Sequence, residues 1–279
     1  MRSCTRASLP REPKAARVLI VIKYGGNAMA APGEPDALLD DIAARVATGD
    51  RVVVVHGGGP QIDVALAERK IAGRRARGLR VTDAATLAVT EHVLCGTVNK
   101  SLVRALWRRG ARACGISGQD GRLIVARPVP PVDGVSLGFV GEIVRVHPAV
   151  IEGLLVAHLV PVVAPLAICE DYAHALNVNA DTAAGAIAGA LGADAYVIVT
   201  NVERVRRDKD DPQSGIARLT AAQARAMLAD GTFDGGMIPK MESALDALAR
   251  GARRVLIAGS SPGALARALG GGGTTVVDA

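Results

Sequence analysis

This chain of 279 residues is poor in aromatic side chains, which make up only 2% of it. The hydrophobic share is nevertheless 49%, so a core must be built mainly from Ala, Val, Leu and Ile. Proteins that bind single-stranded nucleic acid stack bases on aromatic rings. The net charge of +6 comes with scattered arginines. We therefore expect no nucleic-acid partner, and the positive charge fits an Arg-biased surface and an anionic substrate.

Cysteine and long apolar runs are also scarce. The four cysteines show no paired spacing typical of a zinc site or a disulfide framework, so we expect reduced thiols and no metal held by the protein itself. No apolar run is long enough to span a bilayer. The run Val18–Ile22 is too short for a signal peptide and is interrupted by Lys23. We expect a cytoplasmic protein with no membrane partner.

Lysine is rare in a chain that otherwise uses arginine for positive charge. Of the six lysines, Lys23 ends an apolar run and Lys240 follows a glycine-rich turn. A lysine supplies a compact point charge where arginine supplies a planar fork. These two positions are therefore candidates for a site that needs a localised positive charge, although chance placement also explains them.

Strand–turn–helix units repeat along the chain. Buried strands are expected over 17–22, 51–56, 111–116, 160–164, 195–200, 255–258 and 274–277. Helices are expected over 36–48, from 61, and over 82–108, 148–157, 182–191, 220–228 and 241–250, with Thr82, Asp181 and Thr220 as N-caps. This alternation predicts a three-layer α/β/α sandwich around a mainly parallel sheet, with ligands at the carboxyl ends of the strands. Residues 1–16 are expected to be a flexible tail.

The segment Leu176–Gly185 concentrates polar side chains at one strand-to-helix junction. Asn177, Asn179 and Asp181 alternate, and on an extended segment they would point to one side. A buried polar cluster is costly unless something binds to it. A capped helix preceded by two turn asparagines is the plainer interpretation, and the segment alone does not exclude it.

Two glycine-rich turns each follow a buried strand and precede a helix. Gly25–Gly26 comes just after Lys23, and Gly57–Gly59 follows the second strand. Successive glycines let backbone N–H groups approach an anion, and a helix N-terminus adds a favourable dipole. Neither turn matches a P-loop or a dinucleotide-binding fingerprint. Together they indicate phosphate handling.

Seven segments, in order, resemble the amino-acid kinase family, and in particular its members that phosphorylate N-acetylglutamate. They are Lys23–Met29, His56–Asp63, Gly78–Asp83, Gly96–Lys100, Leu137–Glu142, Asn177–Asp181 and Gly235–Lys240. The resemblance implies a two-lobed amino-acid kinase fold. It also implies that MgATP phosphorylates the side-chain carboxylate of N-acetyl-L-glutamate in arginine biosynthesis, with Mg²⁺ carried by the nucleotide.

The resemblance also implies a role for each matching residue. Lys23 would stabilise the transferring phosphoryl group, Lys240 the leaving ADP, and Asp181 would orient both lysines. The backbone N–H groups of Gly25, Gly26, Gly58 and Gly59 would bind phosphoryl oxygens and substrate. Arg80, which follows Gly78–Leu79, and Asn177 would hold the α-carboxylate and the amide of the substrate, with Asn179 beside them.

Nucleotide contacts are implied for Thr200, Asn201 and Val202. Their loop has Asn201 and Arg204 where the family more usually has Asp and Gly. The implied lobes are residues 17–192 for the amino-acid substrate and 193–279 for the nucleotide. Because the N-terminal tail lacks the amphipathic helix associated with arginine-inhibited hexamers, we expect a homodimer with weak or absent arginine feedback.

Three alternatives remain open. A related kinase acts on aminoadipate or glutamate linked to a carrier protein, but the loop before Arg80 lacks the insertion expected for such a substrate. A non-catalytic ligand sensor on the same fold is expected to lose a charged residue, whereas Lys23, Asp181 and Lys240 are all present. A dinucleotide-dependent dehydrogenase is disfavoured because the second strand ends in three glycines and not in an acidic ribose ligand.

Overall fold

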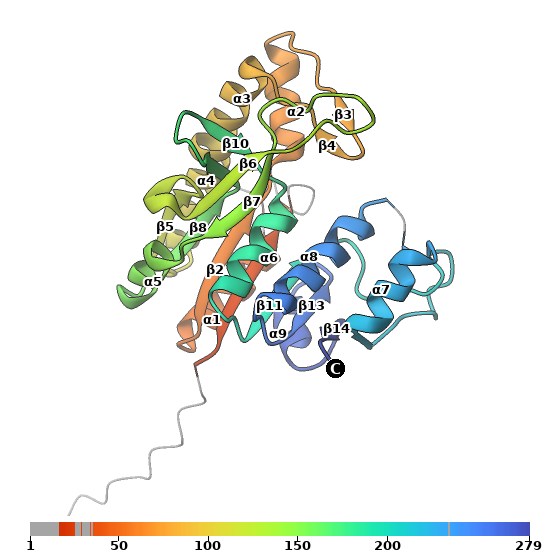
Figure 1. Cartoon of the computed structure of the whole chain (residues 1–279). Coiled ribbons are helices and arrows are strands. Elements are labelled where there is room, and N and C mark those ends of the chain that lie inside the picture. Colours follow the sequence, from red (N-terminus) through yellow and green to blue (C-terminus); the bar gives the residue numbers. More distant parts are fainter. Residues whose placement is uncertain (1–16, 26–28, 30–33, 35, 234) are drawn as a thin grey trace, which may run out of the picture.

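The computed structural model describes residues 17–25, 29, 34, 36–233 and 235–279. The tail expected over residues 1–16, and Gly26, lie outside these residues. The chain is built around an eight-stranded sheet with helices on both faces (Figure 1). In spatial order its strands are β12 (Arg218–Thr220), β14 (Thr274–Val277), β13 (Val255–Ala258), β11 (Ala195–Val199), β1 (Leu19–Tyr24), β2 (Arg51–His56), β8 (Val160–Ala164) and β5 (Ala113–Ser117).

Neighbouring strands run parallel from β5 across to β13, and the antiparallel pairing of β13 with β14 reverses the direction at one edge. A second sheet contains β10 (Ala175–Asn177), β9 (Leu166–Cys169), β6 (Ile124–Pro128) and β7 (Gly141–Val146). A short hairpin pairs β3 (Arg75–Ala76) with β4 (Leu79–Arg80). The expected mainly parallel α/β sheet is therefore present.

Alternation along each strand sends successive side chains to opposite faces of the large sheet. Ile20 and Ile22 of β1 face one hydrophobic cluster, whereas Val21 faces the other. The first face is covered by α1 (Ala37–Ala47), α2 (Gly59–Glu68), α3 (Ala84–Glu91), the π-helical segment His92–Val98, α4 (Asn99–Arg108) and α9 (Ala264–Leu269). The opposite face is covered by α5 (Ala149–Val156), α6 (Ala180–Ala190), α7 (Ala221–Ala229) and α8 (Met237–Ala249).

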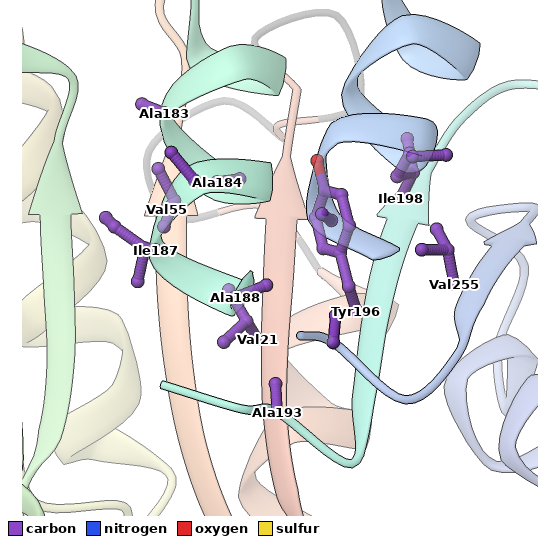
Figure 2. Packing of buried hydrophobic residues seen from close by; sticks show 14 of the residues in the cluster. Val21, Val55, Ala183, Ala184, Ile187, Ala188, Ala193, Tyr196, Ile198 and Val255 are labelled. Carbon is purple, nitrogen blue, oxygen red and sulfur yellow. The ribbon is translucent and has the colours of Figure 1, made fainter. Parts of the chain in front are cut away.

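Small side chains bring α6 down onto the sheet. Ala183, Ala184, Ile187 and Ala188 of α6 are fully buried, and Figure 2 shows them over Val21 and Val55 of the central strands. The small alanine side chains let the helix lie close to the sheet, so no large aromatic side chains are needed to fill the space between them. This packing fixes the start of α6 above the carboxyl end of β1.

Several expected boundaries differ from the structure. Asp83, and not Thr82, caps α3, since its side chain accepts a hydrogen bond from the Thr86 N–H group. The helix expected to run to Arg108 is continuous but passes through the π-helical segment. Asn179, and not Asp181, caps α6, and Asp181 lies in its first turn. Helices α2 and α8 begin at Gly59 and Met237, earlier than expected. The expected capping of α7 by Thr220 is present.

Candidate active site

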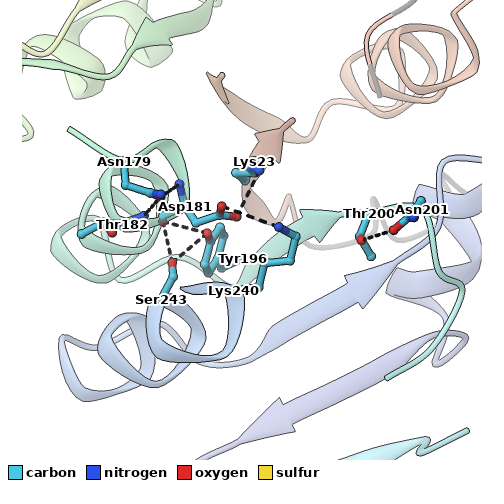
Figure 3. Close-up of polar contacts among 9 residues, drawn as sticks. All are labelled: Lys23, Asn179, Asp181, Thr182, Tyr196, Thr200, Asn201, Lys240 and Ser243. Carbon is cyan, nitrogen blue, oxygen red and sulfur yellow. Dashed lines mark hydrogen bonds and ion pairs between the residues drawn. The ribbon is translucent and has the colours of Figure 1, made fainter. Parts of the chain in front are cut away.

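The centre of the site is a buried carboxylate between two lysines from distant parts of the chain. Lys23 Nζ lies 3.1 Å from Asp181 Oδ1, and both side chains are 8% exposed. Lys240 Nζ lies 3.7 Å from Asp181 Oδ2, with its side chain 17% exposed. Figure 3 shows both ammonium groups pointing toward the carboxylate oxygens. One negative charge is therefore shared by two positive charges.

Lys23 reaches this point because of its place in β1. It follows Val21 by two positions, so both side chains lie on the face that α6 covers. Lys23 lies beside Val55 of β2 and Ile198 of β11 in the parallel register. A long side chain at the carboxyl end of a central strand thus points at the beginning of the helix above it.

Asp181 and Lys240 meet because glycines let α6 and α8 pack closely. A Cβ atom at Gly185 would lie 2.6 Å from Ser243 Oγ, and one at Gly189 would lie 2.3 Å from the Arg250 Cβ atom. Gly185 and Gly189 follow Asp181 at intervals of four residues, so all three lie on one face of α6. The glycines therefore let α8 approach the helix face that carries Asp181.

Hydrogen bonds from neighbouring side chains hold the backbone of Asp181 in place. The hydroxyl groups of Tyr196 and Ser243 both donate to the Asp181 carbonyl oxygen, and the two hydroxyls are 3.0 Å apart. Asn179 Oδ1 accepts from the N–H groups of Asp181 (2.8 Å) and Thr182 (3.3 Å). These contacts leave little freedom to the first turn of α6, which holds the carboxylate in place (Figure 3).

The environment acts in opposite directions on Lys23. Burial lowers the pKa of the Lys23 ammonium, Asp181 raises it, and the nearby Lys240 lowers it, with a net fall. A buried lysine next to a second lysine keeps its charge more readily when a carboxylate lies beside it. Asp181 is therefore the group that favours the charged form of Lys23.

The charged cluster opens into a cavity of about 900 Å³. Six cationic side chains line it, namely Lys23, Arg75, Arg204, Arg206, Lys209 and Lys240, against the two acids Asp63 and Asp181. Asp63 is itself paired with Arg75 at 2.9 Å and with Arg80 at 2.6 Å. The cavity is therefore strongly positive and suited to a polyanionic ligand.

Two helices begin at this cavity with a glycine as the N-cap residue. Neither Gly58, which precedes α2, nor Gly236, which precedes α8, provides a side-chain cap, and both line the cavity. The first N–H groups of a helix have no partner within the helix and carry partial positive charge. Both helices thus point anion-binding ends at the space beside Lys23 and Lys240.

The glycines of the two turns allow close approach. A Cβ atom at Gly25 would lie 3.2 Å from Lys23 Nζ, and one at Gly58 would lie 2.6 Å from Leu94 Cδ2. Gly25, Gly58 and Gly59 all line the cavity. Gly26, which was expected to act with them, lies outside the described residues.

The other expected site residues fall into two groups. Asn179, Thr200, Asn201 and Val202 line the cavity, and Thr200 Oγ1 donates to Asn201 Oδ1. Arg80 and Asn177 do not line it. Arg80 is buried behind the turn, where it pairs with Asp63 and donates to the Gly59 carbonyl at 3.2 Å.

Asn177 donates to Thr82 Oγ1 at 3.2 Å and is the last residue of β10. The expectation that Asn177, Asn179 and Asp181 share one extended segment is wrong, because α6 begins at Ala180. The three side chains consequently have different partners. Asn179 caps the helix, and Asp181 alone contacts the lysines.

Sequence reasoning missed the supporting residues of the site. Tyr196 and Ser243 hold Asp181, and Asp63 and Arg75 line the cavity. The available signals were Asp63 within the second glycine-rich segment and the Gly185–Gly189 spacing in α6. Neither of these signals identifies its tertiary partner.

A model of the amino acid kinase family matches residues 18–259. The chain belongs to the amino acid kinase family. It is 42% identical over 250 residues to the chloroplastic acetylglutamate kinase of Arabidopsis thaliana, which covers 90% of this chain and 71% of that protein. It is 45% identical over 247 residues to the acetylglutamate kinase of Synechococcus sp. (strain CC9605), covering 88% of this chain and 83% of that protein.

Among solved structures, the chain is similar to N-acetylglutamate synthase from Neisseria gonorrhoeae, complexed with coenzyme A and N-acetyl-glutamate. The TM-score is 0.79 and the identity 25%, over 93% of this chain and 59% of that one. These similarities confirm the expected amino-acid kinase fold. Membership in a kinase family makes the chain an enzyme that uses ATP. Within the described part of the chain, no helix is long and apolar enough to cross a membrane.

Proposed function

We propose that this amino acid kinase transfers the γ-phosphoryl group of ATP to the side-chain carboxylate of N-acetyl-L-glutamate, which yields N-acetyl-L-glutamyl 5-phosphate for arginine biosynthesis. The observation that carries the proposal is the convergence of Lys23 and Lys240 on Asp181 in a cavity bordered by the Gly57–Gly59 turn. Relatives that are 42% to 46% identical and named acetylglutamate kinase support the same reaction.

The cavity suits a nucleophile that needs no general base. A side-chain carboxylate is already ionised near pH 7. None of the described residues that line the cavity is a histidine, and both of its acids are ion-paired. Catalysis then consists of in-line positioning and stabilisation of charge on the phosphoryl oxygens.

We assign the two lysines to different oxygens of the reacting system. Lys23, at the carboxyl end of β1 in the proposed substrate lobe, stabilises the transferring phosphoryl group. Lys240, at the start of α8, stabilises the leaving ADP. Asp181 favours the charged form of Lys23 and orients both ammonium groups. The N–H groups of Gly25, Gly26, Gly58 and Gly59 complete the set of donors.

The residues present fit a magnesium nucleotide. The cavity is large, predominantly cationic and bordered by two helix N-termini whose N-cap residue is glycine. Its described carboxylates are paired with lysine or arginine, so a Mg²⁺ ion would be held mainly by phosphate oxygens and water. When bound, Mg²⁺ neutralises charge on those oxygens. We assign Thr200, Asn201 and Val202 at the end of β11 to the nucleotide.

The amino-acid substrate is assigned to the other side of the glycine turn. Arg80 donates to the Gly59 carbonyl and would hold the α-carboxylate, Asn177 would hold the amide, and Asn179, which lines the cavity, would lie beside them. This gives residues 17–192 to the substrate and 193–279 to the nucleotide. A homodimer with weak or absent arginine feedback is part of the same proposal. Sedimentation and an arginine titration of activity test it, and an arginine-inhibited hexamer refutes it.

Trapping the product tests the reaction. Hydroxylamine converts an acyl phosphate into a coloured hydroxamate, so the purified protein is incubated with ATP, Mg²⁺ and N-acetyl-L-glutamate. We expect ATP-dependent hydroxamate, and Lys23→Ala should abolish it while nucleotide binding by calorimetry persists. Turnover only of a carrier-linked glutamate or aminoadipate would replace the proposal by the carrier-linked kinase. ATP and ligand binding without any product would indicate a sensor.

A further inference from the structure

A second cluster of reactive side chains lies away from the cavity, in the loop that joins β9 to β10. Cys169 is the last residue of β9, and Asp171 and His174 follow it in the loop. Their ligand atoms (one sulfur, one carboxylate oxygen and one imidazole nitrogen) all lie within 4.8 Å of one another. None of the three lines the cavity. The proposed phosphoryl transfer does not use them.

The loop holds the three groups on a short, hydrogen-bonded turn. The Cys169 N–H group donates to the His174 carbonyl at 3.0 Å, and the Tyr172 N–H group donates to the Cys169 carbonyl at 2.8 Å. Asp171 Oδ1 accepts from the Ala173 N–H group at 3.0 Å. The His174 ring packs edge-on against Phe139, with 5.0 Å between centroids. The backbone and one ring orientation are thus set before any ligand arrives.

The chemistry of the three donors selects the ion. A sulfur donor disfavours Mg²⁺ and Ca²⁺, which take oxygen ligands. Thiolate, imidazole and carboxylate are the ligands of Zn²⁺, at about 2.3 Å for sulfur and about 2.0–2.2 Å for nitrogen and oxygen. Around such an ion the donor atoms lie about 3–4 Å apart. The three ligand atoms already lie within 4.8 Å of one another, which is close to that spacing.

We propose that Cys169, Asp171 and His174 bind one Zn²⁺ ion, with water in the fourth position. The Cys169 thiol releases its proton to solvent on binding and coordinates as the thiolate. This departs from the expectation of no protein-held metal, which was drawn from the absence of paired cysteines. The required pattern here is Cys-x-Asp-x-x-His within one hairpin.

The bound ion would hold together the β9–β10 hairpin, which leads to the residues proposed to bind the amino-acid substrate. β10 ends at Asn177, and Asn179 then caps the helix that carries Asp181. A metal that binds the folded loop and not the unfolded chain stabilises the fold by mass action. The proposal does not depend on the kinase reaction, because its readouts are metal content and spectroscopy.

Cobalt substitution tests the site. The full-length protein is stripped with a chelator, titrated with Co²⁺ or Zn²⁺, desalted, and measured for metal content and for the cobalt–thiolate absorption band. We expect one metal per chain, a cobalt–thiolate band and a higher melting temperature with Zn²⁺. Cys169→Ser should abolish the band. His174→Gln should weaken affinity at least about tenfold, the loss that even outer-shell changes cause at metal sites.

Matched controls separate this site from adventitious binding. Cys114→Ser removes a half-buried thiol and His92→Gln an exposed imidazole elsewhere in the fold, and both variants should bind metal as the parent does. Circular dichroism of the metal-free variants shows whether each is folded. No retained metal in the parent, a band that survives in a folded Cys169→Ser protein, or equal loss in Cys114→Ser would overturn the proposal.

Discussion

Replacing Asp181 by Asn removes the negative charge that Lys23 and Lys240 share while keeping the shape of the side chain. At the observed separations of 3.1 and 3.7 Å, each attraction is about 5 kcal/mol at an effective dielectric constant of about 20. Removing one partner of a buried ion pair costs about 3–5 kcal/mol in practice. Because both ammonium groups border the cavity and can be partly hydrated, we expect about 3 kcal/mol. The melting temperature should then fall by about 6–12 °C.

The stability and the turnover of the same variant should depend on pH in opposite directions. Without Asp181, the pKa of Lys23 falls further below its ordinary value of 10.5, which burial already lowers. Above the folded-state pKa the unfolded chain binds more protons than the folded one, so stability rises with pH in that window. The stability deficit of the variant should therefore shrink as pH rises. Turnover should fall over the same range, because it needs the charged lysine, and at neutral pH it should be about 100-fold or more below the parent.

Denaturant unfolding and hydroxamate kinetics across the pH range measure both effects. Asp246→Asn is the matched control, since Asp246 forms an exposed ion pair with Arg250 on α8, and such pairs contribute about 0–1 kcal/mol. Adding Lys240→Met to the Asp181 variant should recover part of the lost stability, because one uncompensated charge is removed. An Asp181→Asn protein as stable and as active as the parent would refute the reasoning.

The remaining predictions concern the two glycine-rich turns and His56, the last residue of β2. His56 is fully buried with a pKa of about 4 against 6.5 when exposed, so the unfolded state alone takes up a proton between these values and stability should fall by about 3 kcal/mol as pH drops across them. His56→Gln should flatten that unfolding profile, and an unchanged profile would contradict this. Gly58→Ala places a Cβ atom 2.6 Å from Leu94 Cδ2 and should cost about 1–3 kcal/mol in thermal unfolding. Leu94→Ala should make the added methyl harmless, and additive losses would count against the clash. Gly25→Ala presses on the Lys23 ammonium at 3.2 Å and should lower kcat more than it raises KM for ATP, so the reverse pattern would argue for a binding role.

Much of the fold follows from apolar runs. Strands over 51–56, 160–164, 255–258 and 274–277 have the expected bounds. Each is rich in Val, Leu, Ile or Ala and is followed directly by a Gly, Pro or Asp residue. Helix starts were less predictable where two capping residues lie close together. Thr82 is directly followed by Asp83, and Asn179 is separated from Asp181 by one residue. All four belong to residue types that cap helices. Only the local backbone decides which side chain reaches the free N–H groups.

The charged residues of the site could be predicted from the sequence, whereas the residues that hold them in place could not. Lys23 and Lys240 are conspicuous because lysine is rare in this chain, and Asp181 lies in a polar segment before an apolar helix. Tyr196 and Ser243 carry no comparable signal, since their role depends on α8 lying against α6. The Cys169–Asp171–His174 cluster was missed for a related reason: its spacing has no second cysteine, and only the hairpin brings its ligand atoms together.

The scarcity of aromatic residues and the geometry of the site are connected. Lys23 contacts Asp181 only because α6, whose buried positions are mostly alanine and glycine, lies close to β1. Lys240 contacts the same carboxylate only because Gly185 and Gly189 let α8 approach α6. Larger side chains at these positions would move each helix outward by more than an ion pair tolerates, since the attraction needs separations near 4 Å. The small-residue core is therefore a condition for bringing two lysines, 217 positions apart in the sequence (240 − 23), to one buried acid.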